Sequence, residues 1–183
     1  NLVFTNNIAY GASSVEGWAH GLLIACASGN SVIANNVLDG FDIAALSLIN
    51  RADYRFQGSL DGLRVTDNIL TSYGTQLYHI DGTFPKVLVD RNTLWSRGGW
   101  LAYVVDKGAT NSLNVFRQWT GFDLNGTVQD PQYTDWAGHN YTLLSTSPLL
   151  APKTATANLA VDGFNRTIGG GWGAADVGGA YSL

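Results

Sequence analysis

The chain has 183 residues, of which 45% are hydrophobic and 13% are charged. This length suits one domain with a continuous core, and the low charge excludes a disordered polyelectrolyte. The net charge is −4 and the sequence contains no run of Lys or Arg, which argues against nucleic acid or an anionic membrane as the partner.

A repeat runs through the first part of the chain. Each of its four copies places apolar residues before a polar pair and a second apolar stretch: NLVFTNNIAY from Asn1, NSVIANNVLD from Asn30, GLRVTDNILT from Gly62 and KVLVDRNTLW from Lys86. One asparagine recurs at spacings of 29, 32 and 24 residues, at Asn7, Asn36, Asn68 and Asn92. A further apolar run follows each copy: GLLIACA, AALSLIN, TQLYHID and WLAYVVD. Each repeat therefore holds at least two strands.

Repeats of this length without a sustained 3.6-residue periodicity predict an all-β fold, a parallel β-helix whose coils lie about 4.8 Å apart. An asparagine at the bend between two strands tolerates left-handed backbone and bonds to the coils above and below. We interpret the four asparagines as a structural ladder; the alternative is a row of sugar-binding amides. We expect coils in residues 1–110, and a last coil with a cap in 111–183, because an uncovered final coil exposes strand edges.

Three further segments stand out: NTLWSRGGWLAYV within the fourth repeat, and the later DPQYTDWAGHNYTLLSTSPLL and DGFNRTIGGGWGAADVGGAYSL. Together with the repeat, they resemble the C-terminal part of secreted right-handed parallel β-helix proteins of the pectate-lyase-like superfamily. The matching residues are Asp130, Pro131, Asp135, Tyr141, Leu143, Ser147, Pro148, Asp162, Gly163, Arg166 and Asp176. The chain departs from the family pattern at His139-Asn140, where Gly-Asp is usual, and at its end, where Gly-Gly and Ser182 replace a single Gly and Glu.

The resemblance implies a right-handed parallel β-helix with a C-terminal capping segment, in a secreted or extracellular protein. It does not imply an enzyme, because the superfamily contains lyases, hydrolases, epimerases and proteins without catalysis. The sequence starts at Asn1 and has no Met, and we expect it to be the latter portion of a longer protein. Cys26 is the single cysteine, so no cysteine-based metal site is predicted.

The second apolar runs of two neighbouring repeats each end in an acidic residue. Aligning the ends of those runs places Asn50, Asp81 and Asp106 in one column. Two stacked carboxylates repel, which raises one pKa and makes the pair able to share a proton or to hold Ca²⁺. Asp81 and Asp106 are therefore candidate catalytic residues, with Ca²⁺ as a possible cofactor. The alternative is that both acids only open turns, since glycine follows each closely.

His79 lies two residues before Asp81, and hence on the same face of a regular strand. An imidazole beside a carboxylate could abstract the proton next to a sugar carboxylate, and Tyr78 or Arg64 could assist or hold the acidic sugar. The alternative is an ordinary exposed strand residue. His20 lies just before GLLIACA, on a polar approach loop, and is a weaker catalytic candidate.

Three further residues are candidates for substrate binding. The insertion from Ile49 to Asp61 could form the wall of a groove and present Arg55 to an acidic polysaccharide, or it could be a solvated loop. Trp95 and Trp100 flank SRGG at a turn, and their flat rings could stack on sugar faces or pack inside the protein.

These observations predict an extracellular carbohydrate-active protein, either a polysaccharide lyase or a glycoside hydrolase, or the C-terminal part of one. The alternative from another class is a non-catalytic glycan-binding, adhesive or structural surface module. Polysaccharide is the predicted partner. We also expect one of two further partners: an N-terminal β-helix portion of the same parent protein, or a stacking subunit. The unpaired strands of the first coil have free backbone N–H and C=O groups that such a partner could bond.

Overall fold

The computed structural model describes residues 1–11, 17–25, 29–50, 59–72 and 75–150, and the backbone of 174–175 and 179–180. The chain divides into a compact unit over Asn1–Leu150 and a second unit over Ala151–Leu183. In the second unit, β17 (Ala174–Ala175) pairs with β18 (Gly179–Ala180) in antiparallel fashion. No helix in the described ranges is long and apolar enough to cross a membrane.

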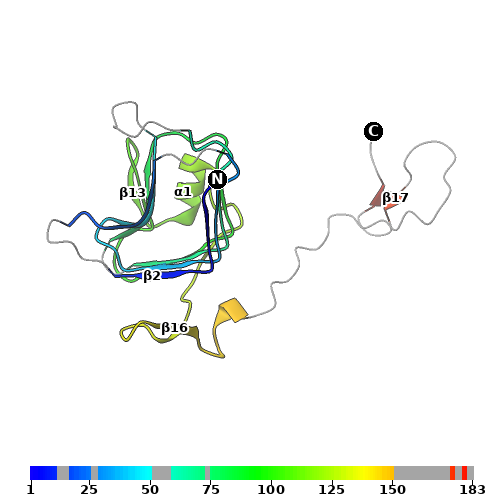
Figure 1. The fold of residues 1–183 in the computed structure, drawn as a ribbon. Coiled ribbons are helices and arrows are strands. Elements are labelled where there is room, and N and C mark those ends of the chain that lie inside the picture. Colours follow the sequence, from blue (N-terminus) through cyan, green and yellow to red (C-terminus); the bar gives the residue numbers. More distant parts are fainter. Residues whose placement is uncertain are drawn as a thin grey trace. The chain divides into compact units, whose positions relative to one another are not determined.

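Short strands dominate the first unit, which confirms the all-β prediction at the level of fold class. Three sheets each take one strand from every repeat, in chain order, and the strands of successive repeats overlie one another in Figure 1. Sheet 1 contains β1 (Val3–Thr5), β4 (Val32–Ala34), β7 (Arg64–Thr66) and β10 (Leu88–Asp90). All of its pairings are parallel.

Sheets 2 and 3 repeat this arrangement with one added strand each. Sheet 2 contains β2 (Ile8–Tyr10), β5 (Val37–Asp39), β8 (Ile69–Ser72), β11 (Thr93–Ser96) and β14 (Thr127–Val128). Sheet 3 contains β3 (His20–Ile24), β6 (Ala44–Ile49), β9 (Gln76–Asp81), β12 (Ala102–Val104) and β13 (Gly108–Thr110). Only the β12–β13 pairing in these two sheets is antiparallel.

Each repeat holds three strands because a left-handed residue divides its first apolar segment. Those residues are Asn6, Asn35, Asp67 and Arg91, with φ between 57° and 60°. Asn and Asp enter this region more readily than most residues, whereas Arg rarely does. The ladder asparagine comes directly afterwards, so the left-handed position is one residue earlier than the sequence interpretation placed it.

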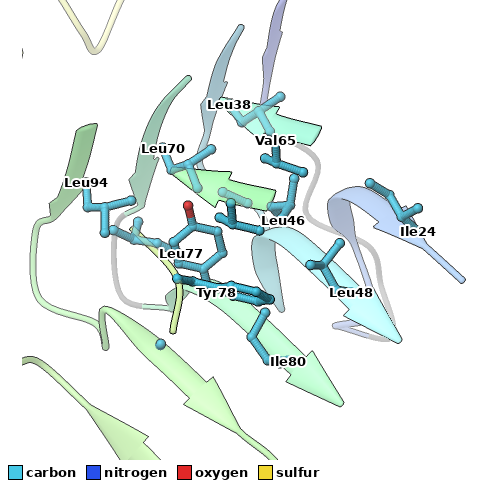
Figure 2. Packing of buried hydrophobic residues seen from close by; sticks show 14 of the residues in the cluster. Ile24, Leu38, Leu46, Leu48, Val65, Leu70, Leu77, Tyr78, Ile80 and Leu94 are labelled. Atoms are coloured by element: carbon cyan, nitrogen blue, oxygen red, sulfur yellow. The ribbon is translucent and has the colours of Figure 1, made fainter. Parts of the chain in front are cut away.

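The core lies between the three sheets, where inward-facing positions of successive strands stack on one another. In sheet 1 these are Ile33, Val65 and Val89, with at most 2% of the side chain exposed. Leucines from sheets 2 and 3 meet them, and Figure 2 shows the contacts around Leu46 and Leu70. Full burial of one such side chain stabilises the fold by about 1.5–3 kcal/mol.

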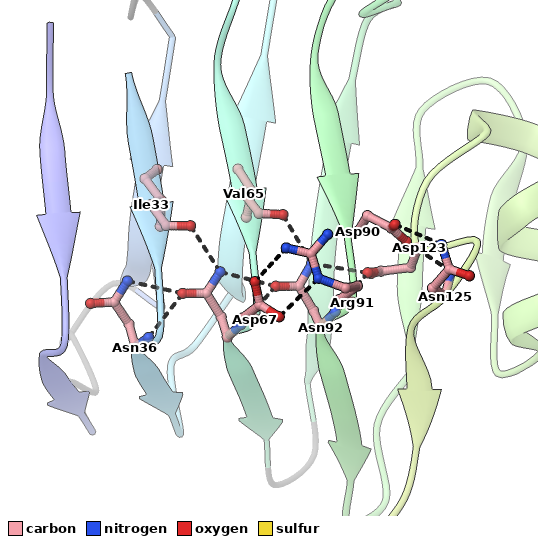
Figure 3. A network of polar contacts seen from close by, with 10 residues as sticks. Ile33, Asn36, Val65, Asp67, Asp90, Arg91, Asn92, Asp123 and Asn125 are labelled. Carbon is pink, nitrogen blue, oxygen red and sulfur yellow. Dashed lines mark hydrogen bonds and ion pairs between the residues drawn. The ribbon is translucent and has the colours of Figure 1, made fainter. Parts of the chain in front are cut away.

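The four asparagines form the expected ladder, and Figure 3 shows its part from Asn36 to Asn92 and Asp123. The backbone N–H and the Nδ2 of Asn36 both donate to Oδ1 of Asn68, at 3.0 and 2.9 Å. Asn7 donates in the same way to Asn36, and Asn68 to Asn92, at 2.9 to 3.1 Å. Asn92 donates to Oδ1 of Asp123 at 3.0 and 2.9 Å. These bonds satisfy amides at a bend where the sheet hydrogen bonds are interrupted.

One helix follows the last repeat. Helix α1 (Leu113–Thr120) begins after Ser112, whose hydroxyl accepts from the N–H of Val115, and ends at Gly121 with a left-handed φ of 74°. Its Phe116 is fully buried and stacks on Tyr78 with ring centroids 5.1 Å apart. The helix is too short to produce the sustained periodicity that would reveal it in the sequence.

A hairpin completes the first unit. It consists of β15 (Tyr133–Asp135) and β16 (Asn140–Leu143), which pair in antiparallel fashion, and a 3₁₀ turn, η1 (Pro148–Leu150), follows it. The side chains of this hairpin contact the outer face of sheet 2, as described below.

Candidate functional site

One outward-facing row of sheet 3 gathers side chains that can carry chemistry. Leu23, Ser47, His79 and Tyr103 occupy the same register position in β3, β6, β9 and β12. Their neighbours in the strands, including Leu46 and Tyr78, belong to the core. Because successive strand residues point to opposite faces, the row faces away from the core. A hydroxyl, an imidazole and a phenol therefore lie side by side on this face.

His20 joins this row from the first position of β3. Its Nδ1 lies 2.6 Å from Oγ of Ser47, and its ring centroid lies 6.3 Å from that of His79, with the rings nearly perpendicular. On its other side His79 stacks on Tyr103, with centroids 5.6 Å apart and an angle of 23° between the rings. We call His20, Ser47, His79 and Tyr103 the His79 cluster.

Burial sets the protonation of the two imidazoles. It lowers the pKa of His79, and the nearby Asp81 opposes this shift. Burial also lowers the pKa of His20, and the charge of His79 lowers it further. Both rings are therefore neutral at pH 7 and can accept a proton. Nδ1 of His79 is buried without a hydrogen-bond partner in the described part of the chain.

Exposure differs along the cluster. Tyr103 has 38% of its side chain exposed, whereas Ser47 is fully buried. His20 and His79 are both half-buried. A ligand on this face would therefore meet the phenol and the imidazoles, while the Ser47 hydroxyl orients the ring of His20.

The predicted alignment, which placed Asn50, Asp81 and Asp106 in one column, is wrong by one position. Asp81, the last residue of β9, lies opposite Ile49 in β6. Strand β12 ends at Val104, opposite Ile80, and the N–H of the next residue, Val105, bonds to Ile80. Asp106 follows in a turn, with a left-handed φ of 69°, and is exposed.

The error arose because the ends of the runs were aligned on polar residues, whereas the sheet aligns the apolar positions. Among the described residues, no group of three or more His, Cys, Asp and Glu side chains lies close enough to hold a metal ion.

Tyr78 does not have the predicted role in holding a substrate. It is fully buried, and its hydroxyl donates to Oδ2 of Asp123 at 2.7 Å. Burial raises its pKa well above the ordinary value. Tyr78 precedes His79 in the strand and therefore points to the opposite face, into the core.

The other predicted binding residues are dispersed. Arg64 is exposed at the start of β7, in sheet 1, and is not on the sheet of the His79 cluster. Trp95 is half-buried in β11 of sheet 2. Trp100 is 50% exposed and lies two residues before β12, on the same segment as Tyr103. Arg55 lies outside the described residues.

Sequence reasoning missed Ser47 and Tyr103. The signal that could have found them is the pattern apolar-x-apolar in the second runs, which reads Leu46-Ser47-Leu48 in one repeat and Ala102-Tyr103-Val104 in another. Aligning on those flanking apolar residues gives the register that the structure has.

A second polar cluster lies on the outer face of sheet 2 and is covered by the hairpin. Asp39 is 3% exposed and accepts from the hydroxyl of Thr71, from Trp136 Nε1 at 2.5 Å and from the Tyr141 hydroxyl at 2.9 Å. Arg97 lies 3.8 Å from Asp39 and over the ring of Trp136. Both carboxylate oxygens are occupied, so this cluster holds the hairpin in place.

A hollow of about 320 Å³ lies beside α1. Its lining is mainly apolar and includes Ile80, Phe84, Trp119 and Phe122. It contains none of the His79 cluster, which lies on an open outer face. A long polymer fits an outer sheet face better than a hollow of this size.

No protein-family model, curated protein or solved structure matches this chain. Functional inference therefore rests on the geometry of the described residues.

Proposed function

We propose that the chain is a right-handed parallel β-helix of the pectate-lyase-like kind that cleaves an extracellular acidic polysaccharide by β-elimination at the His79 cluster. Three sheets that each take one strand per repeat, with parallel pairing between repeats, and the asparagine ladder support the fold part of this proposal. In this fold α1 is the C-terminal cap of the core, through the contact of Phe116 with Tyr78.

The observation that carries the catalytic part is a neutral imidazole stacked on an exposed phenol. The pKa of His79 is lowered by burial, and its ring lies against that of Tyr103. A neutral imidazole is a suitable base near pH 7, and a phenol can donate a proton to a leaving oxygen. Paired carboxylates, which a glycoside hydrolase needs on either side of the scissile bond, do not stack on this face.

In the proposed reaction His79 takes the proton from the carbon next to the sugar carboxylate. The bond between the adjacent carbon and the glycosidic oxygen breaks, and a double bond forms between those two carbons. Tyr103 gives its phenolic proton to the departing oxygen. His20 is a positioning residue, because its edge-on contact keeps the two imidazoles on one face. The exposed ring of Trp100 provides a surface for an adjoining sugar.

The test is a panel of uronate-containing polysaccharides, with ultraviolet absorbance detecting the unsaturated products. We expect product from at least one polymer, and a loss of kcat of about 100-fold or more in His79→Gln and in Tyr103→Phe. His139→Gln is the matched control, because His139 is exposed on the hairpin and lies outside the cluster. Absence of unsaturated product from every polymer contradicts the proposal. Repeating the assay with a chelator tests whether cleavage requires Ca²⁺, the possible cofactor named from the sequence.

A glycan-binding module is the second candidate. The observation that favours it is the exposure of three aromatic side chains in or next to β3 and β12: Trp18 at 70%, Trp100 at 50% and Tyr103 at 38%. Flat exposed rings bind sugar faces without any chemistry. In that case Trp100→Ala would abolish retention on a polysaccharide gel, His79→Gln would leave it unchanged, and no polymer would be cleaved.

A further inference from the structure

The loop between α1 and β14 contains the single Asn-Gly pair of the chain, Asn125-Gly126. An asparagine followed by glycine is prone to spontaneous deamidation, because glycine has no side chain that hinders its backbone nitrogen. That nitrogen attacks Cγ of the asparagine, and the ring that forms is then opened by water. The sequence therefore places a reactive pair between the helix and the last strand of sheet 2.

The fold requires glycine at this position. Gly126 is buried, and a Cβ atom added to it would lie 2.8 Å from Cβ of Asp123 and 2.9 Å from its Cγ. Asp123 is held in place, because its carboxylate accepts from Asn92 at the end of the asparagine ladder and from Tyr78 in the core. The reactive pair is thus a consequence of how the ladder ends.

Asp90, the last residue of β10, holds the asparagine of the pair (Figure 3). Its Oδ1 accepts from the backbone N–H of Asn125 and its Oδ2 accepts from Nδ2, both at 2.8 Å. Hydrogen bonds to a charged acceptor are about twice as strong as those between neutral groups. The N–H of Gly126 is occupied as well, because it donates to the backbone oxygen of Asp123 at 2.9 Å. Ring closure therefore requires these bonds to open.

The product of deamidation does not suit this contact. It replaces the Nδ2 donor of Asn125 by a carboxylate oxygen, which would face the carboxylate of Asp90 where a hydrogen bond now lies. Burial raises the pKa of Asp90, but the bonds from Asn125 and the nearby charge of Arg91 outweigh it and hold that pKa below its ordinary value. Two ionised carboxylates this close repel each other. Conversion therefore breaks the contact for good.

The same loop ties the helix to the sheets. Arg117 of α1 donates to the backbone oxygens of Asp123 and Gly126, at 2.8 and 2.9 Å. The N–H of Thr127, the first residue of β14, donates to the backbone oxygen of Asn92 at 3.0 Å. A change at the Asn-Gly pair therefore affects α1 and the last strand of sheet 2 together.

We infer that Asn125 is a site of spontaneous deamidation and that its contact with Asp90 controls the rate. In the reaction the backbone nitrogen of Gly126 loses its proton and bonds to Cγ of Asn125, and ammonia leaves from that carbon. Water then opens the succinimide at either carbonyl and gives aspartate or isoaspartate. The conversion adds a negative charge beside Asp90 and loosens the loop that ties α1 to β14. This inference does not depend on the proposed catalysis.

The test measures conversion at Asn125 in the folded and the unfolded protein. The full chain is incubated in mildly alkaline buffer with and without urea, and the peptide that contains Asn125 is analysed by mass spectrometry for aspartate and isoaspartate. Asp90→Ala removes the carboxylate that controls the rate. Asp61→Ala is the matched control, because it removes an exposed carboxylate whose ion pair is with Lys86.

We expect Asp90→Ala to convert about tenfold faster than the parent chain or more, since losing a hydrogen bond to a charged group favours opening of the loop by that factor. Asp61→Ala should convert at the parent rate, and urea should accelerate conversion of the parent by about tenfold or more. An unchanged rate in a folded Asp90→Ala variant overturns the inference. Equal conversion of the parent with and without urea also overturns it, and that comparison needs no variant.

A further pair of variants tests the consequence of conversion. Asn125→Asp imitates the product, and we expect its thermal midpoint to fall by about 3–6 °C relative to the parent. Asn125→Ala loses the side-chain bond without adding a charge, so its midpoint should fall less. A midpoint of Asn125→Asp equal to that of the parent overturns the inference that conversion loosens this loop.

Discussion

Two outer faces of the molecule carry similar side chains that have different roles. The row on sheet 2 runs through Tyr10, Asp39, Thr71 and Trp95, and the row on sheet 3 runs through Leu23, Ser47, His79 and Tyr103. Asp39 is buried with both oxygens occupied, whereas Nδ1 of His79 is buried with no partner among the described residues. A buried polar group with its partners stabilises the fold, and one without them costs stability.

The hairpin produces this difference. Trp136 and Tyr141 reach Asp39 from 97 and 102 residues away in the chain and exclude water from its carboxylate. Among the described residues, the covered cluster still contains two buried groups without a hydrogen bond, Nη1 of Arg97 and the hydroxyl of Tyr133. Burial raises the pKa of Tyr133. The contrast therefore concerns the central group of each row. Asp39 has a structural role, and His79 is available for chemistry.

The largest expected effect comes from Asp39→Ala. This change leaves the donors of Thr71, Trp136 and Tyr141 without an acceptor and Arg97 without its counter-charge. We expect the free energy of unfolding to fall by about 3–5 kcal/mol, as measured by urea denaturation. A loss below about 1 kcal/mol would show that the hairpin does not depend on this carboxylate.

A smaller effect distinguishes the two faces with one kind of substitution. Tyr141→Phe removes a hydrogen bond to a carboxylate and should cost about 1.5–3 kcal/mol. Tyr103→Phe removes an exposed hydroxyl and should change stability by less than about 0.5 kcal/mol. Equal losses in the two variants would contradict the assigned roles.

His79→Phe should stabilise the protein. Phenylalanine keeps the stacking on Tyr103 and removes a buried nitrogen that has no hydrogen-bond partner among the described residues. We expect a gain of about 1 kcal/mol in the free energy of unfolding, together with the loss of any cleavage activity. A fall in the free energy of unfolding as large as that of a core substitution would show that the imidazole has a structural role.

The smallest effect is a pH dependence of stability. The folded-state pKa values of His20 and His79 are lowered. Below about pH 6.5 the unfolded chain therefore binds more protons than the folded chain does. Stability should therefore fall as the pH drops from about 6.5 through the folded-state values. Unfolding curves of the parent chain and of a His20→Gln, His79→Gln double variant check this. The variant should lose stability less steeply in that window, and an unchanged slope would contradict the pKa assignment.

The sequence predicted the regular part of the molecule and missed what depends on long-range contacts. The 24- to 32-residue spacing of Asn7, Asn36, Asn68 and Asn92 indicated stacked strands, because the repeats lack a sustained 3.6-residue periodicity. The third strand of each repeat was missed, since nothing local signals that Arg91 adopts a left-handed conformation.

Of the His79 cluster, the sequence predicted His79 and, as a weaker candidate, His20. Ser47 and Tyr103 were missed because they belong to other repeats. Aligning the runs on their polar ends placed Asp106 beside Asp81, whereas the sheet pairs Tyr103 with His79. Tyr78 was assigned to the surface although alternation along β9 turns it into the core. The pairing of Asp39 with the hairpin depends on packing across most of the chain and has no local sequence signal.

The most direct test of the account compares kcat and the free energy of unfolding in two single variants, Tyr103→Phe and Tyr141→Phe, on a uronate polysaccharide that the parent chain cleaves. We predict that Tyr103→Phe is as stable as the parent and loses kcat by about 100-fold or more, and that Tyr141→Phe is destabilised and keeps its kcat. Full activity in Tyr103→Phe, or activity lost in Tyr141→Phe while that variant remains folded, would contradict the assignment of the catalytic face to sheet 3.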